Sequence, residues 1–141
     1  MTKKDFWPNS TVAIIGGGSW GTVLAKLISG NCREIRVSVR DEEQARAINA
    51  TRANPNYVSG LQLNDKVHAY PSLERIFEGE VHAVIWALPS SICRAQAKLL
   101  APHLRGDEIV LHATKGVEEG TLKRISEVLG EELPVPRIGV I

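Results

Sequence analysis

The sequence contains few cysteines and no long apolar segment, and each absence excludes a class of protein. Its two cysteines, Cys32 and Cys93, lie far apart and outside any CxxC pattern, so we expect free, reduced thiols. No apolar run approaches the roughly 18–20 residues of a membrane span. The N-terminus lacks the apolar stretch of a signal peptide. These features predict a cytoplasmic protein without a membrane span.

The sequence also lacks an excess of charge of either sign. Its 17 basic residues face 16 acidic ones, and the formal net charge is +1. Such a balance creates no broad positive field, so we expect no nucleic-acid partner, and any anion site must be local. His68, His82 and His103 show no metal-ligand spacing, and no Ser/His/Asp grouping indicates hydrolysis. No metal site is therefore expected.

Short apolar segments alternate with segments of helical periodicity along a chain that has the length of one domain. Alternation of this kind predicts right-handed βαβ units and an α/β fold, a doubly wound parallel Rossmann sheet with helices on both faces. We expect residues 1–10 to form an N-terminal extension and residues 11–141 to form the Rossmann domain. Strands are predicted at 12–15, 34–40, 67–70, 81–88, 108–112 and 137–141, and helices after Gly21, from Asp41, and at 72–77, 92–100 and 121–129.

A glycine motif follows the first predicted strand and opens the first predicted helix. Gly16, Gly18 and Gly21 have the G-x-G-x-x-G spacing of dinucleotide-binding proteins. In that motif the glycines permit a tight turn, a close approach to a pyrophosphate and close packing of helix on sheet. The helix N-terminus then offers free N–H groups to the phosphates. The context favours nucleotide binding over a glycine-rich turn without a ligand.

The end of the second predicted strand carries the residues that distinguish NAD from NADP. An acidic residue there would bind the ribose 2′-hydroxyl of NAD, whereas this chain has Arg40 followed by Asp41. A guanidinium group pairs well with a 2′-phosphate, which favours NADP(H) with NAD(H) still possible. In the alternative interpretation Arg40 is a solvated charge and Asp41 only caps the next helix, with Gln44 completing a capping box.

Lys115 follows the fifth predicted strand, at the sheet edge where ligands bind in open α/β folds. A lysine there could donate a proton or a hydrogen bond to a carbonyl oxygen that gains negative charge as hydride arrives. Its position alone fits a solvated surface lysine equally well. We expect the nearby His112 to be a partly buried, hydrogen-bonded side chain rather than an acid.

Four segments of the chain resemble bacterial NAD(P)-dependent glycerol-3-phosphate dehydrogenases, in family order and with family spacing. They are Gly16-Gly-Gly-Ser-Trp-Gly-Thr22, Asn54-Pro-Asn-Tyr57, Ala87-Leu-Pro-Ser90 and Lys115-Gly-Val-Glu-Glu-Gly-Thr-Leu-Lys-Arg-Ile-Ser-Glu-Val128. The resemblance implies reduction of dihydroxyacetone phosphate to sn-glycerol 3-phosphate for phospholipid synthesis. It also implies that Lys115 contacts both cofactor and substrate as a catalytic residue. The implied cofactor-binding residues are Gly16, Gly17, Gly18, Ser19, Trp20, Gly21, Arg40, Tyr57 and Lys115.

The chain departs from the family pattern in three ways. Val58-Ser59 replaces a common Leu-Pro, and Ser38 stands where the family often has tryptophan. The family's Ser-Gly-Pro motif and helical C-terminal domain, with a second catalytic lysine, are missing, which predicts a fragment that binds cofactor without turnover. The intact enzyme is expected to be a homodimer. In an alternative to cofactor contact by its side chain, Trp20 anchors the first helix in the core and only its backbone serves the pyrophosphate.

Two other functions fit parts of the sequence. A related reductase with a 2-keto acid or sugar-acid substrate would share the glycine motif, but such relatives carry their lysine in the second domain. A sensor module that binds NAD(P) and regulates a partner should be complete near this length, whereas this chain ends inside an apolar strand.

Overall fold

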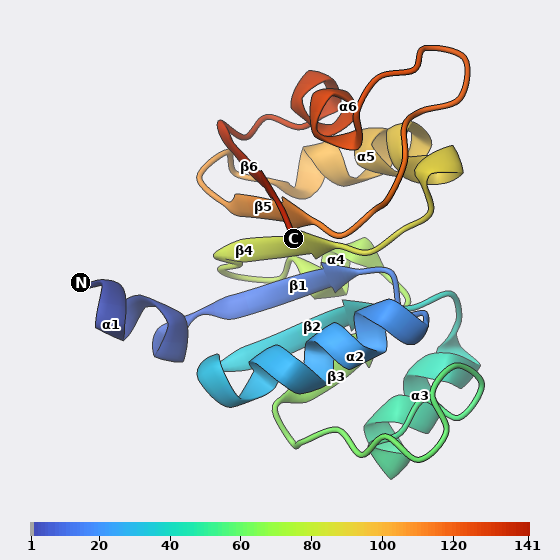
Figure 1. Cartoon of the computed structure of the whole chain (residues 1–141). Helices are drawn as coiled ribbons and strands as arrows, with labels where there is room; N and C mark the ends of the chain where they lie inside the picture. The colour runs from blue at the N-terminus through green and yellow to red at the C-terminus, as the bar shows by residue number, and fades with distance from the viewer. Residues whose placement is uncertain (1) are drawn as a thin grey trace.

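A computed structural model describes residues 2–141, whose strands form one six-stranded parallel sheet (Figure 1). Its order is β3-β2-β1-β4-β5-β6, which is the doubly wound order of the Rossmann fold and confirms the predicted fold class. Every neighbouring pair is parallel. The strands are β1 (Thr11–Ile15), β2 (Glu34–Ser38), β3 (Val67–Tyr70), β4 (Ala83–Trp86), β5 (Ile109–His112) and β6 (Arg137–Val140).

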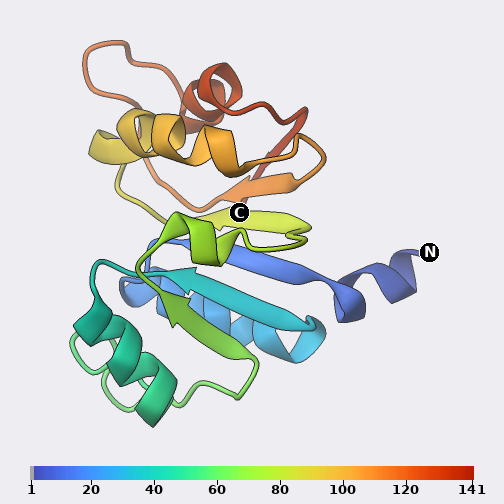
Figure 2. The same cartoon turned by 180° about the vertical axis from the view of Figure 1, so that it is seen from behind.

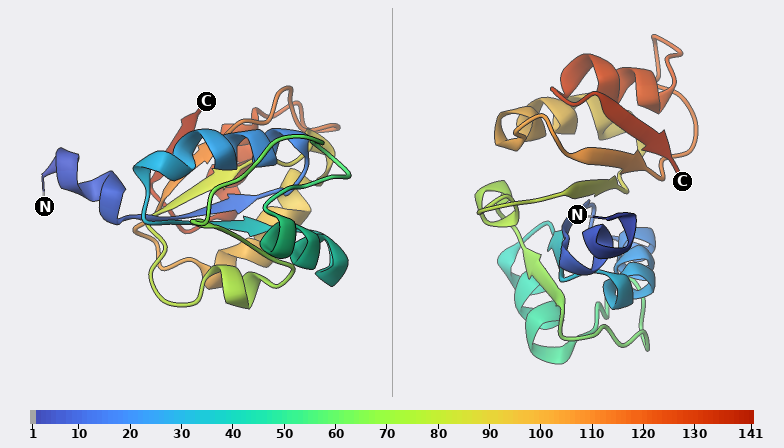
Figure 3. Two further views of the ribbon diagram at one scale, coloured as in Figure 1. Left: turned by 90° about the horizontal axis from the view of Figure 1, so that it is seen from below. Right: turned by 90° about the vertical axis from the view of Figure 1, so that its left-hand side faces the viewer.

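The chain adds β2 and β3 on one side of β1 and then adds β4, β5 and β6 on its other side. The connecting helices therefore divide between the two faces of the sheet. The left view of Figure 3 shows α2 and α4 on opposite faces, and Figure 2 shows α4 and α5 together. The helices are α1 (Lys3–Phe6), α2 (Ser19–Ile28), α3 (Glu42–Thr51), α4 (Leu73–Ile76), α5 (Cys93–Leu100) and α6 (Ile125–Glu132). No helix among these described residues is long and apolar enough to cross a membrane.

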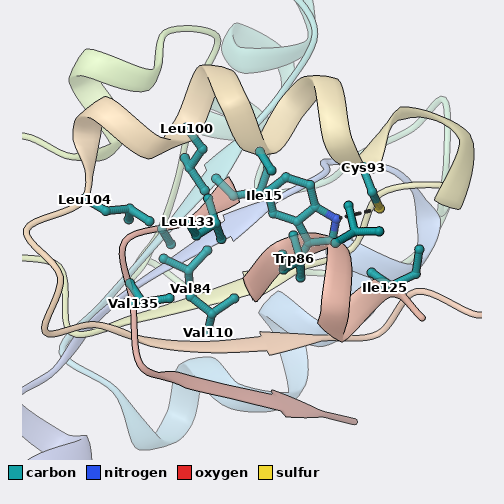
Figure 4. Packing of buried hydrophobic residues seen from close by; sticks show 14 of the residues in the cluster. Ile15, Val84, Trp86, Cys93, Leu100, Leu104, Val110, Ile125, Leu133 and Val135 are labelled. Atoms are coloured by element: carbon teal, nitrogen blue, oxygen red, sulfur yellow. Dashed lines mark hydrogen bonds between the residues drawn. The ribbon is translucent and has the colours of Figure 1, made fainter. Parts of the chain in front are cut away.

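Each face of the sheet has its own hydrophobic core. Trp86 lies at the centre of the core beneath α5 and α6, and its indole Nε1 donates to Cys93 Sγ at 3.0 Å (Figure 4). The core beneath α2 and α3 is built on β1 and β2 residues such as Ile14 and Ile35. Cys32 and Cys93 are both buried and free, as predicted. Burial of a continuous apolar surface on both faces is what stabilises a parallel sheet.

The parallel register brings the carboxyl ends of four strands to one edge of the sheet. Ile15 at the end of β1 pairs with Ser38 of β2 and Trp86 of β4, and Trp86 pairs with His112 of β5. The order reverses between β1 and β4, so the loops that follow these strands diverge there and leave room for a ligand. In Figure 1 the arrowheads of β1 and β2 point to this edge, and the N-terminus lies at the opposite one.

Several predicted boundaries differ from the structure. The strand predicted at 81–88 is shorter, at Ala83–Trp86. The helix predicted at 121–129 begins only at Ile125, because Leu122 has a left-handed backbone (φ 59°) and Val117 pairs with Arg124 in an isolated bridge. Apolar spacing identified this helix, but the turn that delays its start depends on contacts of the preceding loop.

The first helix is present where predicted, but its buried face differs from the apolar spacing. Its buried residues are Gly21, Thr22, Leu24 and Ala25. Trp20 and Leu27 are 50% and 64% exposed, so Trp20 does not anchor this helix in the core. The close approach is confined to the first turn, where the Gly16 carbonyl oxygen leaves no room for a Cβ atom at Gly21, whereas Leu24 is buried further along the helix.

We predict that Leu129→Ala lowers the free energy of unfolding by about 2–5 kcal/mol, because Leu129 is 0% exposed in the core beneath α5 and α6. Leu99→Ala is the matched control, since Leu99 is 59% exposed on α5 and its loss should cost less than about 0.5 kcal/mol. Urea unfolding measures both. Equal losses in the two variants would contradict this packing.

Candidate functional site

Two glycines allow α2 to begin directly at the end of β1. Gly16 has a φ of 117°, and a Cβ atom there would lie 2.5 Å from the carbonyl oxygen of Ala87. A Cβ atom at Gly21 would lie 1.8 Å from the carbonyl oxygen of Gly16. Neither position can hold another residue without movement of the backbone. The strand, the helix and the loop after β4 therefore meet at the point where the sheet order reverses.

The middle glycine of the motif is open, in contrast to its neighbours. A Cβ atom at Gly18 would find only Tyr57 Cδ1 within 4.0 Å. Thr22 is the first residue of this turn whose backbone N–H has a protein acceptor, the Gly18 carbonyl oxygen at 3.0 Å. Within residues 2–141, the N–H groups of Ser19, Trp20 and Gly21 have none. Open space beside unpaired N–H groups at a helix N-terminus fits a pyrophosphate group.

Two polar side chains that the sequence analysis did not select hold this loop from beneath. Gln44 Nε2 and Asn54 Nδ2 donate to the Gly17 carbonyl oxygen at 2.7 and 3.0 Å. Asn54, which is 1% exposed, also donates to Thr22 Oγ1 at 2.8 Å. The sequence signalled Gln44 only as a helix cap and Asn54 only as part of a loop motif, and their shared acceptor became visible only in the folded chain.

Ser19 and Tyr57 lie together beside the glycine loop, and Trp20 follows Ser19 in the first turn of α2. Ser19 Oγ donates to the Tyr57 carbonyl oxygen at 3.0 Å. Trp20 and Tyr57 are 50% and 41% exposed. The structure thus brings Ser19 and Tyr57 together at this loop, and both aromatic side chains are accessible to solvent. Their contact with a dinucleotide stays a prediction.

Arg40 and Asp41 differ in how the fold uses them. Arg40 is exposed just beyond the end of β2, and its backbone N–H donates to Gln44 Oε1 at 3.2 Å. Asp41 Oδ1 accepts from the backbone N–H of Gln44 at 2.9 Å, so it caps α3 as predicted. The expected capping box is incomplete, because the Gln44 side chain bonds to Gly17 and Arg40 instead of Asp41. The Asp41 carboxylate is used by the helix cap, whereas the exposed guanidinium group of Arg40 is available to bind a ligand.

The loop that carries Lys115 is attached to the loop after β4. Thr114 Oγ1 donates to the Leu88 carbonyl oxygen at 2.7 Å, and the Ala113 N–H donates to the Trp86 carbonyl oxygen at 2.9 Å. Lys115 itself is exposed. These bonds place it at the edge of the sheet where the glycine loop also lies, as the sequence predicted.

An ion-pair network holds the far side of the same loop. Arg94 on α5 donates to both carboxylate oxygens of Glu118, at 2.7 and 2.8 Å, and also pairs with Glu131 and Glu132 of α6. The Arg94 guanidinium lowers the pKa of Glu118 to about 2. Bidentate geometry is the strongest form of such a pair, so the segment after Lys115 is tied to two helices.

His112 is buried but not hydrogen-bonded, which corrects the expectation of a satisfied side chain. It is 5% exposed at the end of β5, and neither ring nitrogen has a hydrogen-bond partner among the described residues. Burial lowers the pKa of His112, although the backbone of Thr114 is near enough to oppose this shift in part. The neutral form of the imidazole is therefore favoured at pH 7 more than it is in a free histidine.

A cavity lies elsewhere, on the face of the sheet beside α2. It has a volume of about 710 Å³ and a mostly apolar lining that includes Leu24, Ile85 and Leu111. It contains none of the predicted site residues. The candidate site is therefore defined by backbone donors and loops at the sheet edge rather than by an enclosed pocket.

The sheet order, the glycine loop and the free N–H groups define a dinucleotide-binding Rossmann domain. A family model described as NAD-dependent glycerol-3-phosphate dehydrogenase N-terminus matches residues 11–141. The chain therefore belongs to this family.

Individual relatives agree with the family assignment. The chain is 41% identical over 132 residues to a glycerol-3-phosphate dehydrogenase (NAD(P)+) of Pseudomonas paraeruginosa, covering 92% of this chain and 38% of that protein. The corresponding enzyme of Lactococcus lactis is 36% identical, and the match again covers 92% of this chain and 38% of that protein. A crystal structure of glycerol-3-phosphate dehydrogenase from Coxiella burnetii superposes with a TM-score of 0.81 at 26% identity, covering 94% of this chain and 40% of that one. The chain thus spans about two fifths of the length of these relatives.

We predict that the buried His112 makes the domain less stable below about pH 6.5, the ordinary pKa of histidine. The unfolded chain takes up this proton at a higher pH than the folded chain, so stability is complete above that pKa. It falls by at most about 1.4 kcal/mol per pH unit as the pH decreases toward the folded pKa. His112→Leu should reduce this fall in urea unfolding between pH 7 and pH 5.

The control is His103→Leu, at a less buried histidine that stacks on Phe77, and it should keep the fall in stability. If His112→Leu loses as much stability on acidification as the unchanged chain, another group is responsible.

Proposed function

We propose that this chain is the cofactor-binding part of a glycerol-3-phosphate dehydrogenase that reduces dihydroxyacetone phosphate to sn-glycerol 3-phosphate. The observation that carries the proposal is the open backbone at Gly18, next to unpaired N–H groups at the start of α2. Membership of the family supports the same conclusion. The role in phospholipid synthesis, the cytoplasmic location and a homodimeric intact enzyme belong to this proposal and rest on the resemblance in sequence.

The cofactor site would use the glycine loop for the diphosphate and Arg40 for the adenosine end. Gly16, Gly17, Gly18 and Gly21 shape the loop, and Ser19 and Trp20 begin the helix above it. The exposed guanidinium of Arg40 at the end of β2 favours NADP(H), because it matches a 2′-phosphate and the Asp41 carboxylate is used by the helix cap. NAD(H) remains a possible cofactor, since a ribose hydroxyl also fits this exposed place.

Lys115 would act on the substrate. Bound NAD(P)H supplies the hydride that reaches the ketone carbon. Lys115 lies on the loop after β5 and donates a hydrogen bond, or a proton, to the carbonyl oxygen, where negative charge develops. The bonds from Thr114 to Leu88 and from Arg94 to Glu118 hold this loop on both sides of the lysine. A lysine on a fixed loop is suited to this role because it need not be reorganised when the charge appears.

We predict that this chain binds NADPH more tightly than NADH, and that Arg40→Gln weakens NADPH binding about tenfold, the effect of losing one charge-assisted hydrogen bond. Binding of NADH should change less than about twofold, because NADH has no 2′-phosphate. Isothermal titration calorimetry measures all four affinities. The control Arg46→Gln removes an exposed guanidinium from α3 and should leave both affinities unchanged. Equal weakening of NADH and NADPH by Arg40→Gln would disprove the 2′-phosphate role.

Lys115→Met should lower the affinity for NADPH about five- to tenfold, since a charged donor to the cofactor is lost while the apolar stem is kept. Lys98→Met, at an exposed position of α5, serves as the control. The same titrations apply. Unchanged binding in Lys115→Met would show that this lysine does not reach the cofactor.

A further inference from the structure

The carbonyl oxygen of Gly17 is the meeting point of two side chains from distant parts of the chain. Gln44 on α3 and Asn54 in the following loop donate to it at 2.7 and 3.0 Å. Each donor is itself held in place. The second N–H of the Asn54 amide donates to Thr22 Oγ1 at 2.8 Å. Gln44 Oε1 accepts a hydrogen bond from the Arg40 backbone N–H at 3.2 Å. Two donors to one oxygen determine where that carbonyl group points.

The direction of the Gly17 carbonyl determines the direction of the next N–H group. No cis peptide bond occurs among the described residues, so the Gly17–Gly18 peptide is trans and its C=O and N–H point to opposite sides. With the oxygen bonded to Gln44 and Asn54, the Gly18 N–H points away from these two side chains, and it has no acceptor within residues 2–141. Rotation of this peptide would instead present a carbonyl oxygen, which repels phosphate.

We propose that Gln44 and Asn54 are positioning residues, which orient the Gly17–Gly18 peptide so that the Gly18 N–H donates to the diphosphate of the cofactor. This inference rests on the proposed function. Gln44 also links the diphosphate loop to the adenosine end of the site, because the same amide group bonds to Gly17 and to the backbone of Arg40. Neither residue touches the cofactor, and both act through the peptide they hold.

The test separates the diphosphate from the 2′-phosphate by using two ligands. NADP+ carries both groups, whereas adenosine 2′-monophosphate carries only the latter. Gln44→Met keeps the length of the side chain and adds no charge. It should raise the Kd for NADP+ about tenfold, as expected for loss of a hydrogen bond that orients a donor. The Kd for adenosine 2′-monophosphate should change less than about twofold, because its phosphate is bound by the Arg40 guanidinium, whereas Gln44 bonds to Arg40 only at the backbone N–H. Gln62→Met, in the exposed loop, is the matched control.

A second measurement reports on the peptide itself. In NMR spectra of the unchanged chain, the Gly18 amide proton should shift downfield when NADP+ is added, as a new hydrogen bond forms. This shift should be lost or much reduced in Gln44→Met. Asn54 is almost completely buried and its replacement risks unfolding, so the less buried Gln44 carries the test.

Each outcome decides the inference. Equal weakening of both ligands, or unchanged NADP+ binding with an unchanged Gly18 shift, would overturn the positioning role while leaving the proposed function intact. If the unchanged chain binds neither ligand, the proposed function fails, and this inference fails with it.

Discussion

The close contact between the first turn of α2 and the end of β1 is the constraint on which the rest of the site depends. At Gly21 the helix backbone lies against the Gly16 carbonyl oxygen, and at Gly16 the strand end lies against Ala87 of the next loop. The helix N-terminus consequently opens at the sheet edge, where its unpaired N–H groups concentrate a partial positive charge. A dinucleotide site needs this arrangement before any side chain is considered, because the diphosphate is bound by backbone groups.

A long irregular segment supports this contact despite its lack of regular structure. Residues 52–66 contain no helix or strand, yet Asn54 in this segment is as deeply buried as the core. Its amide joins the carbonyl of Gly17 to the hydroxyl of Thr22, and Tyr57 packs over Gly18. Since a buried polar side chain is stable only when its hydrogen bonds are made, these partners hold the segment against the glycine loop.

The two halves of the sheet hold their loops by different physical means. Around the glycine loop the contacts are neutral hydrogen bonds between amides, hydroxyls and backbone carbonyls. Around the Lys115 loop a charged network joins Arg94 to the carboxylates of Glu118, Glu131 and Glu132. The partners of the glycine loop are neutral, so the helix N-terminus is a source of positive potential there, whereas the carboxylates near Lys115 outnumber the cations that pair with them.

The sequence by itself determined the sheet, the order of its elements, the glycine loop and the places of Arg40 and Lys115, because apolar periodicity, glycine spacing and strand ends are local properties. Only the tertiary structure decided which side chains meet. Gln44 was predicted to complete a capping box, but its side chain donates to the Gly17 carbonyl oxygen. His112 was predicted to be hydrogen-bonded, but it is buried and neither ring nitrogen has a hydrogen-bond partner among the described residues. Trp20 has helical apolar spacing yet is half exposed, whereas the next two residues, Gly21 and Thr22, are buried. Such outcomes depend on distances between segments far apart in the chain, which no local pattern contains.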